Sequence, residues 1–305
     1  MRRKIPSLQA LACFDAAARY QSYTRAAQEL ALTQSAVSRQ VAALEDYLGL
    51  ELFRRTRHGV VLTAAGSQYA RQIAPRLQAL ERDTLDAMSG QGAGGAIYLV
   101  AVPTFAARWL VPRLPAFAAA HPDAVVHTES RTRPFLFTDT ELDAALYAST
   151  PEGMAQWAGT RAVRLLPEVV LPVCAPRCMA GRQTLSAAEV AGLPLLQQST
   201  RPQAWPLWLE AAGPPGEPAP GHALGGPRFE QFSMTTAAAV AGMGVALIPQ
   251  LLIEDELRSG ALVVANPLPH PEERHYYLVL PEGQAERPAL QQFGQWLQET
   301  VRANP

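Results

Sequence analysis

The stretch from Thr33 to Leu48 carries two superposed patterns, and it constrains the fold more than any other part of the chain. Apolar residues recur at positions i, i+4, i+7 and i+11, and they predict one helical stripe that faces a core: Val37, Val41, Leu44 and Leu48. The opposite face carries side chains that can bond base edges and phosphates: Gln34, Ser35, Ser38 and Arg39. Thr33 can cap such a helix with its hydroxyl. The stretch therefore predicts a recognition helix for the major groove of DNA.

The flanking residues complete a helix-turn-helix module with a wing. One helix is expected from Ser7 to Ala18, and a second after Ser22 or Thr24. Gly49 is expected to end the recognition helix, and a short two-stranded hairpin with a basic tip follows it. Three arginines of this hairpin are predicted to lie along the phosphate backbone: Arg54, Arg55 and Arg57.

Charge is unevenly distributed along the 305 residues, although the formal net charge is only −1. Residues 1–80 hold 11 Lys and Arg against 5 Asp and Glu, whereas residues 91–305 hold 14 against 19. A basic head on an acidic body indicates a polyanionic partner for the head alone. Residues 240–253, the longest apolar stretch, are too short to span a bilayer, and no signal-peptide pattern is evident. We therefore expect a cytoplasmic protein without a membrane partner.

A long helix is predicted over residues 63–88, with Thr63 as its cap. Its apolar seam is expected to pair with a second copy of the chain: Tyr69, Ile73, Leu77, Leu80 and Met88. Pro75 predicts a kink near residues 71–75, because an interior proline removes a backbone hydrogen bond. The glycine-rich residues 89–95 are expected to form a flexible hinge.

Beyond the hinge, strand-like and helix-like segments alternate, which favours parallel α/β layers. Strands are expected over 97–102, 124–128, 142–147, 193–197 and 275–280, and helices over 106–120 and 288–302. Crossings near 165 and 265 predict two subdomains with a cleft between them. The chain is thus divided into a winged helix-turn-helix (1–62), a linker and dimerisation helix (63–88), a hinge (89–95), subdomain I (96–164 with 266–305) and subdomain II (165–265).

Polar residues that follow the predicted strands are candidates for a small-molecule site, because parallel α/β sheets bind ligands at the carboxyl ends of their strands. Thr104 stands where a strand gives way to a helix, so its hydroxyl and the helix N–H groups can bind an anion. The candidate residues are Thr104, Phe105, Ser130, Arg131, Tyr147, Ser199, Thr200, Phe232 and Ser233. Arg131, Arg133 and Arg201 favour a ligand that bears a carboxylate, while Trp205 and Trp208 are expected in the core.

The N-terminal module resembles the LysR-type transcriptional regulators at positions that span all of it: Phe14, Ser22 to Ala27, Leu30, Thr33-Gln34, Ala36 to Val41, Leu44-Glu45, Leu48-Gly49, Leu52 to Arg55 and Leu62 to Gly66. The family usually has glycine where Gln21 stands and often proline where Ser35 stands. The C-terminal part is similar to the subgroup of the glycine-cleavage and β-lactamase-induction regulators at Val102 to Ala106, Trp109 to Leu114, Pro172 to Cys174, Trp205, Trp208, Gly242 to Pro249 and Trp296-Leu297.

The resemblance implies a multidomain α and α/β fold, with a winged helix, a linker helix and a two-subdomain effector domain of the periplasmic-binding-protein type. It implies a ligand-responsive regulator that binds double-stranded promoter DNA as a dimer or tetramer, contacts RNA polymerase and associates with the nucleoid. A small-molecule effector is expected, and no cofactor or metal. The effector, the operator and the direction of regulation stay open.

Other classes of protein fit the sequence less well. An enzyme would need a nucleophile or metal constellation, and the six histidines show no ligand spacing, so no enzyme is predicted. A solute-binding transport protein fits residues 95–300, but it would have no use for a basic helix-turn-helix. Cys174 and Cys178 lack a second ligand pair at zinc-site spacing, and they are expected to be ordinary cysteines unless they have a redox role.

Overall fold

The computed structural model describes residues 4–57, 59–88, 95–140, 142–214, 216, 219, 221–283 and 287–303. The chain forms two compact units whose main boundary lies near residue 90. Most of the predicted hinge, residues 89–94, lies outside the described residues. Among the helices of the described part, none has both the length and the apolarity needed to cross a membrane.

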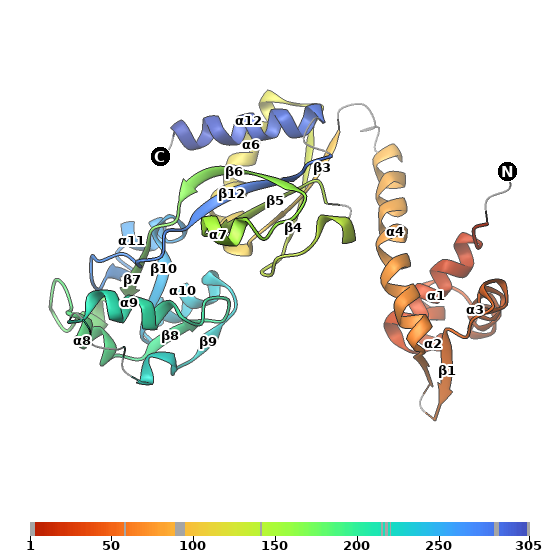
Figure 1. The fold of residues 1–305 in the computed structure, drawn as a ribbon, viewed down its shortest axis with the longest axis horizontal. Coiled ribbons are helices and arrows are strands. Elements are labelled where there is room, and N and C mark those ends of the chain that lie inside the picture. The colour runs from red at the N-terminus through yellow and green to blue at the C-terminus, as the bar shows by residue number, and fades with distance from the viewer. Residues whose placement is uncertain are drawn as a thin grey trace. The chain divides into compact units, whose positions relative to one another are not determined.

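The N-terminal unit is a helical module with a two-stranded wing and one long helix (Figure 1). Its elements are α1 (Leu8–Tyr20), α2 (Tyr23–Glu29), α3 (Gln34–Leu48), β1 (Phe53–Thr56), β2 (Gly59–Leu62) and α4 (Ala64–Met88). Ser7, Ser22 and Thr33 cap the first three helices, each accepting a hydrogen bond from a backbone N–H of the first turn. The predicted helices, caps and hairpin of this unit are therefore confirmed.

The module has an apolar core beneath helix α3. Val37, Val41 and Leu44 are buried in it, and Leu48 packs partly against it. Phe14 contributes the central ring, with its centroid 5.6 Å from that of Phe53 on the wing. The predicted apolar stripe of α3 thus faces the core, and the wing is packed into the same cluster.

Two backbone positions fix how the helices turn. Gly49 ends α3 with φ +67°, the left-handed conformation that glycine adopts most easily. Gln21 ends α1 with φ 50° and ψ 32°, a conformation that is costly for a residue with a Cβ atom. Glycine at position 21 would relieve that cost.

Helix α4 runs without interruption through Pro75, so the proline does not end it. The Thr63 hydroxyl caps it by accepting the Gly66 N–H at 2.9 Å. Gly66 passes so close to the wing that a Cβ atom there would lie 2.0 Å from the Leu52 carbonyl oxygen. The start of α4 is therefore packed against the DNA-binding module, while the predicted kink near Pro75 stays a prediction.

The C-terminal unit contains two five-stranded sheets, and the first has the strand order β4-β3-β5-β12-β6. Its strands are β3 (Ala96–Ala101), β4 (Val125–Ser130), β5 (Ala144–Ser149), β6 (Thr160–Pro167) and β12 (His275–Pro281). A continuous helical stretch of α5 (Pro103–Phe105), η1 (Ala106–Leu110), η2 (Val111–Arg113) and α6 (Leu114–Ala120) follows β3. Helices α6 and α12 (Pro288–Ala303) cover one face of this sheet (Figure 1), and α7 (Pro151–Met154) follows β5.

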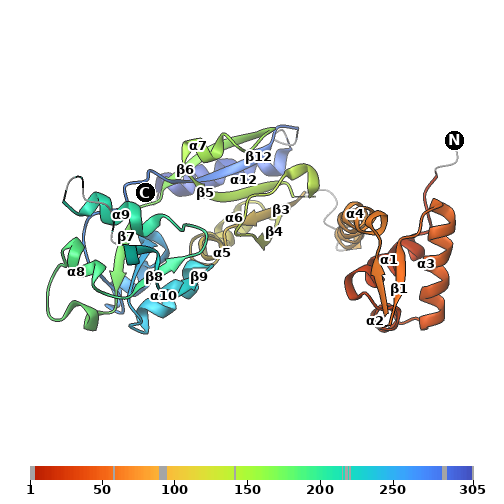
Figure 2. The same ribbon diagram turned by 60° about the horizontal axis from the view of Figure 1, so that its bottom comes forward.

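The second sheet has the order β11-β7-β10-β8-β9. Its strands are β7 (Val170–Cys174), β8 (Leu195–Gln198), β9 (Arg228–Phe229), β10 (Val245–Pro249) and β11 (Val263–Val264). Helices α8 (Ala187–Ala191) and α9 (Ala204–Ala212) pack on one face, and α10 (Phe232–Val240) packs on the other (Figure 2). Helix α11 (Glu254–Arg258) packs against the same cluster as α10 through Leu257. Trp205 and Trp208 are buried on the α9 side, which confirms their predicted place in the core.

Both sheets are mixed, which corrects the prediction of purely parallel layers. Strand β3 pairs parallel with β4 and β5, but β12 pairs antiparallel with β5 and β6. The chain leaves the first sheet after β6 and returns to it through β12, so the strands at the crossings run in opposite directions. Strand β6 continues to Pro167, three residues beyond the predicted end of the first segment of subdomain I at 164.

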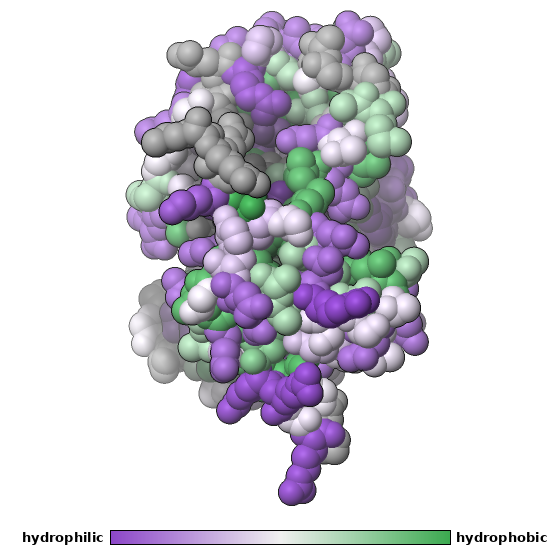
Figure 3. Space-filling model, turned by 90° about the vertical axis from the view of Figure 1, so that its right-hand side faces the viewer, coloured by the Kyte–Doolittle hydropathy of each residue, from purple (hydrophilic) through white to green (hydrophobic). Residues whose placement is uncertain are grey.

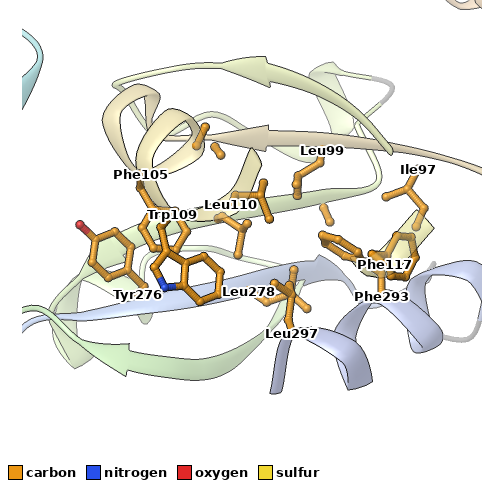
Figure 4. Close-up of a cluster of buried hydrophobic side chains, with 14 of the residues drawn as sticks. Ile97, Leu99, Phe105, Trp109, Leu110, Phe117, Tyr276, Leu278, Phe293 and Leu297 are labelled. Atoms are coloured by element: carbon orange, nitrogen blue, oxygen red, sulfur yellow. The ribbon is translucent and has the colours of Figure 1, made fainter. Parts of the chain in front are cut away.

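The core of the first sheet is aromatic at the end that faces the second sheet. The rings of Phe105 and Tyr276 stack with centroids 4.1 Å apart, and Trp109 stacks on Phe105 at 4.9 Å. Figure 4 shows the three rings together, with the hydroxyl oxygen of Tyr276 pointing away from the cluster. This packing fixes the helical stretch after β3 and so positions the residues at its start.

We expect Gln21→Gly to raise the free energy of unfolding of the N-terminal unit by about 0.5–1 kcal/mol, because glycine tolerates the left-handed conformation better than glutamine. Urea unfolding of the full chain, followed by circular dichroism, measures this change. Gly49→Ala is the matched control, with open space around its Cβ position, and it should lower stability by a similar amount. A lower stability for Gln21→Gly would contradict this account of the turn.

Candidate nucleic-acid interface and ligand cleft

The predicted base-reading residues share one solvent face of α3. Gln34, Ser35 and Arg39 are exposed, and Ser38 is half-buried. Thr33 is exposed as well, but its Oγ1 accepts the Ala36 N–H at 3.2 Å and lies 3.1 Å from the Ser35 Oγ. The structure therefore brings the predicted set together, with Thr33 engaged chiefly as the helix cap.

The wing is tied to α3 by one carboxylate. Glu45 Oε1 accepts hydrogen bonds from the backbone N–H groups of Leu52 at 2.7 Å and Phe53 at 3.0 Å. Two backbone donors at the start of β1 are thereby satisfied by a side chain of the recognition helix. The helix and the wing consequently form one rigid body.

The wing arginines are exposed, but they do not all point the same way. Arg54 and Arg55 are consecutive in β1, so their side chains leave opposite faces of the strand. Arg55 lies on the side of Tyr23, where burial and the Glu45 carboxylate raise the pKa of Tyr23 to about 12 and Arg55 opposes them. Figure 3 shows the hydrophilic surface of the hairpin that projects at the bottom of the view. A single line of phosphates can therefore contact Arg54 or Arg55 more readily than both.

The first half of the predicted dimerisation seam packs within the chain. Tyr69, Ile73 and Leu77 lie against the core of the DNA-binding module, and the Tyr69 ring is 5.4 Å from that of Phe14. These three residues are half-buried against their own chain, and their pairing with a second copy stays a prediction. The far half is exposed, with Leu80 at 47% and Met88 at 79%. Leu85, which the spacing argument left out, is 58% exposed.

A cavity of about 260 Å³ lies between the two sheets of the C-terminal unit. The first sheet and its helices contribute residues from four segments, and the second contributes two loops. The lining residues are Val102 to Phe105, Thr132, Pro134, Tyr147 to Ser149, Gly153, Gln156, Trp157, Glu168, Gln198, Thr200, Arg201, Glu230 to Phe232, Leu252, Arg274 and Tyr276. We call this cavity the cleft.

A buried ion cluster forms part of the wall of the cleft. The Glu168 side chain has no exposed surface, and Arg201 embraces it with Nη2 2.9 Å from Oε1 and Nη1 2.8 Å from Oε2. Arg274 approaches from the other side, with its Nε 3.3 Å from Oε2. The Tyr276 hydroxyl also bonds the carboxylate. One buried carboxylate is thus shared by two cations and a phenol.

The charges around Glu168 decide its protonation. Burial by itself would raise the pKa of Glu168, but the charge and hydrogen bonding of Arg201, together with Arg274 and Tyr276, hold it below the ordinary value of 4.5. Burial and the neighbouring carboxylate raise the pKa of Tyr276 well above its usual range. At neutral pH the cluster therefore contains an ionised Glu168 and a neutral phenol.

Several polar contacts cross the cleft from one sheet to the other. The Ser233 N–H donates to Thr104 Oγ1 at 3.0 Å, and the Thr132 hydroxyl donates to Glu230 Oε1 at 2.7 Å. Outside the cavity lining, Arg108 of η1 pairs with Glu256 of α11 at 2.6 Å. These contacts hold the two sheets around the cavity, and each one can be exchanged for water or ligand.

The structure gathers only part of the predicted ligand set. Thr104, Phe105, Tyr147, Thr200 and Phe232 line the cleft, although the Phe105 ring belongs mainly to the core. Four predicted residues do not line it: Ser130, Arg131, Ser199 and Ser233.

Each of these four residues lies outside the lining of the cleft for a local structural reason. Strand β4 ends two residues later than expected, so Ser130 is the last residue of an edge strand. Arg131 pairs with Glu129 at 2.8 Å and lies over the Phe135 ring. The Ser199 N–H bonds the Phe229 carbonyl, and Ser233 reaches the cleft only through Thr104.

The sequence argument missed the residues on the crossings between sheets. Glu168 follows β6 and Arg274 precedes β12, and both line the cleft. Gln198 was missed because it ends a buried strand; its amide donates to the Glu230 carbonyl at 2.6 Å and to Thr200 Oγ1 at 3.2 Å. Glu168 and Arg274 are charged residues next to the inferred crossings, and this position was the sequence signal that could have identified them.

The cysteines and acidic residues offer no metal site in the described part of the chain, where no group of three potential ligands occurs together. Burial raises the pKa of Cys174 to about 11, so its thiol stays protonated at neutral pH. This protonation argues against a reactive thiolate at Cys174.

Family models match both parts of this architecture. Residues 8–67 match the model described as bacterial regulatory helix-turn-helix protein, lysR family, and residues 90–302 match the LysR substrate binding domain. The glycine cleavage system transcriptional activator of Escherichia coli is 35% identical over 298 residues, which are 97% of this chain and 94% of the relative. The regulator TrpI of Pseudomonas aeruginosa is 36% identical over 306 residues, 99% of each chain.

Solved structures share the fold. The effector domain of AmpR from Pseudomonas aeruginosa has a TM-score of 0.59 at 27% identity, covering 68% of this chain and 96% of that one. Full-length CbnR in complex with its target DNA has a TM-score of 0.70 at 18% identity, covering 96% of this chain and 99% of that one. The match of residues 8–67 to the helix-turn-helix family model favours a regulator over a transport-type solute-binding protein.

Glu168→Gln tests the ion cluster through its pH dependence. The lowered folded-state pKa means that the stabilisation by Glu168 is fully present above its unfolded-state pKa and is lost as pH falls through the folded-state value. We expect the substitution to lower the free energy of unfolding by about 3–5 kcal/mol at neutral pH, because it leaves buried arginines without their counter-charge.

Thermal unfolding of the full chain at several pH values measures this effect, and the gap to the unmodified protein should narrow below about pH 4. Exposed Glu254→Gln is the control and should change little at any pH. A gap that is constant with pH would contradict the assigned charge state.

Proposed function

The chain belongs to the LysR-type transcriptional regulators, and we propose that it controls promoters by reading DNA with α3 and the wing while a small molecule occupies the cleft. Regulators of this family bind DNA and respond to ligands through an effector-binding domain. The observation that carries the proposal is one chain with both a capped, exposed polar helix face and a polar cavity between two sheets. Both act by binding, so no catalytic step is assigned.

We assign base and backbone contacts to residues of α3, its cap and the wing: Thr33, Gln34, Ser35, Ser38, Arg39, Arg54, Arg55 and Arg57. The Arg39 fork can bond guanine through two atoms or hold a phosphate, and Gln34 can pair with adenine. The clamp between Glu45 and the wing supports simultaneous binding, because it fixes the distance between the two sets.

We assign the effector to the cleft, with Thr104, Thr200 and Arg201 around a carboxylate group. Thr104 as a whole residue is only 5% exposed, and it lies where β3 gives way to a helix. This is the position at which α/β sheets usually bind ligands. We propose the same domain limits as those predicted from the sequence. In the structure, the chain crosses between the two sheets at residues 168–169 and 265–274.

The exposed end of α4 supports self-association. Leu80, Leu85 and Met88 present apolar side chains to solvent, and pairing with a second copy would bury them. We propose a dimer as the minimal DNA-binding form, a tetramer as the full assembly, and RNA polymerase as a further partner at the promoter. The site of action is then the chromosome in the cytoplasm.

The proposed switch is a shift between conformations. A ligand that binds the closed cleft better than the open one displaces the equilibrium toward closure. In an oligomer this shift changes the placement of paired DNA-binding modules, and hence half-site spacing or DNA bending.

Arg39→Ala should weaken binding to a promoter fragment recovered by genome-wide footprinting by about 1–3 kcal/mol. If Arg39 contacts a phosphate, the dependence of affinity on salt should also become shallower. Fluorescence anisotropy of the labelled fragment measures both. Exposed Arg258→Ala in α11 removes the same charge elsewhere and should leave the isotherm unchanged; an unchanged isotherm for Arg39→Ala would refute its role.

Thr104→Val should leave DNA affinity intact and abolish the change in promoter activity that the effector causes. The reason is that valine keeps the shape of threonine but removes the hydroxyl that bonds Ser233 and faces the cleft. A promoter fusion in cells and anisotropy on the purified protein give the two readouts. Normal regulation by this variant would rule out the cleft assignment.

A further inference from the structure

The lining of the cleft is electrically balanced. It contains two acids, Glu168 and Glu230, and two arginines, Arg201 and Arg274. Glu168 already pairs with both arginines, and Glu272 pairs with Arg274 at 3.1 Å. A ligand with a lone negative charge would therefore meet no surplus of positive charge, whereas a zwitterion would leave the balance unchanged.

Two threonine hydroxyls are prepared to donate to an anionic group. Thr104 Oγ1 accepts the Ser233 N–H at 3.0 Å, and Thr200 Oγ1 accepts the Gln198 amide at 3.2 Å. A hydroxyl that accepts one bond still has its own proton to donate. Arg201 lies close by, with its guanidinium over the Phe232 ring at 4.9 Å. This end of the cleft suits a carboxylate.

A carboxylate that lines the same cleft suits a cation. Glu230 is exposed, and its Oε1 accepts the Thr132 hydroxyl at 2.7 Å. A carboxylate has about four acceptor positions, so it can receive an ammonium group as well. Glu230 lies three residues before Ser233, which bonds Thr104. The acidic and hydroxyl groups therefore flank one short segment of chain.

A second cavity of about 220 Å³ opens beside the acidic end. It shares Pro134, Gly153, Gln156 and Trp157 with the cleft, and its other walls include Phe135, Leu136 and Phe137. We call it the aromatic annex. The Trp157 ring stands at the junction, 5.5 Å from Phe135 and 5.1 Å from Tyr147.

The annex is connected to the acidic subsite by the chain itself. Thr132, which bonds Glu230, lies in the same loop as Phe135, Leu136 and Phe137. Leu136 is 56% exposed at the rim of the annex. An apolar group of a ligand would cover these side chains, and burial of aromatic surface is strongly favourable.

From these juxtapositions we propose that the effector is an α-amino acid, or a close zwitterionic analogue, with an aromatic or similarly large apolar side chain. Its carboxylate binds Thr104 and Thr200, its ammonium binds Glu230, and its side chain passes Trp157 into the annex. This inference rests on the proposed role of the cleft as the effector site.

Calorimetric titration of the full chain with four probes tests the class of ligand. L-phenylalanine should bind at least about tenfold more tightly than glycine, 3-phenylpropionate or 2-phenylethylamine, each of which lacks one of the three recognised groups. Equal binding of 3-phenylpropionate would overturn the ammonium subsite. Equal binding of glycine would overturn the annex, and no binding of L-phenylalanine would overturn the amino-acid class.

Two substitutions test the subsites separately. Glu230→Gln should weaken L-phenylalanine about tenfold and leave 3-phenylpropionate unchanged, while exposed Glu210→Gln on α9 changes neither. Leu136→Ala should weaken L-phenylalanine but not glycine, while exposed Leu268→Ala changes neither. An unchanged affinity in either test variant refutes that subsite. The proposed function is judged apart from this, by the promoter response of Thr104→Val.

Discussion

One fully buried carboxylate, Glu168, organises the C-terminal unit. It lies on the crossing from the first sheet to the second, Arg274 lies on the return crossing, and Arg201 belongs to a loop of the second sheet. The Glu168 N–H also donates to the Arg274 carbonyl at 2.8 Å, so backbone and side chains join the two crossings. Removing one partner from such a cluster leaves a charge stranded away from water. A change in the angle between the two sheets must therefore keep the pairing of Glu168 with Arg201 and Arg274 intact.

The contacts across the cleft have a different character from this cluster. The bonds from Ser233 to Thr104 and from Thr132 to Glu230 each involve a hydroxyl group at the cavity surface. Hydroxyl groups exchange partners at little cost, because water or a ligand can replace the lost bond. A strong pairing at the crossings and weak bonds across the opening are the arrangement that permits a cleft to open and close without loss of the fold.

Much of the N-terminal unit could be predicted from the sequence because its signals are local. Ser7, Ser22, Thr33 and Gly49 cap their helices as expected, and the apolar spacing of α3 identifies its buried face.

The ligand site was harder to predict because it depends on long-range packing. Thr104 was found from the strand-to-helix transition, but Glu168 and Arg274 meet only after the chain has crossed between sheets twice. Ser130 and Arg131 lie outside the cleft because β4 ends at Ser130, two residues beyond its predicted end. The partner of the α4 seam could not be predicted, because an apolar stripe does not reveal whether it packs on the same chain or on another.

Tyr69, Ile73 and Leu77 pack against the core of the helix-turn-helix module. The first turns of α4 are therefore part of the same rigid body as α3. The Glu45 clamp makes the wing part of the same body. Because these contacts join α4 to α3 and the wing, a rotation of the first turns of α4 would be transmitted directly to α3. A rotation of a few degrees would turn all of the proposed base-reading side chains through the same angle.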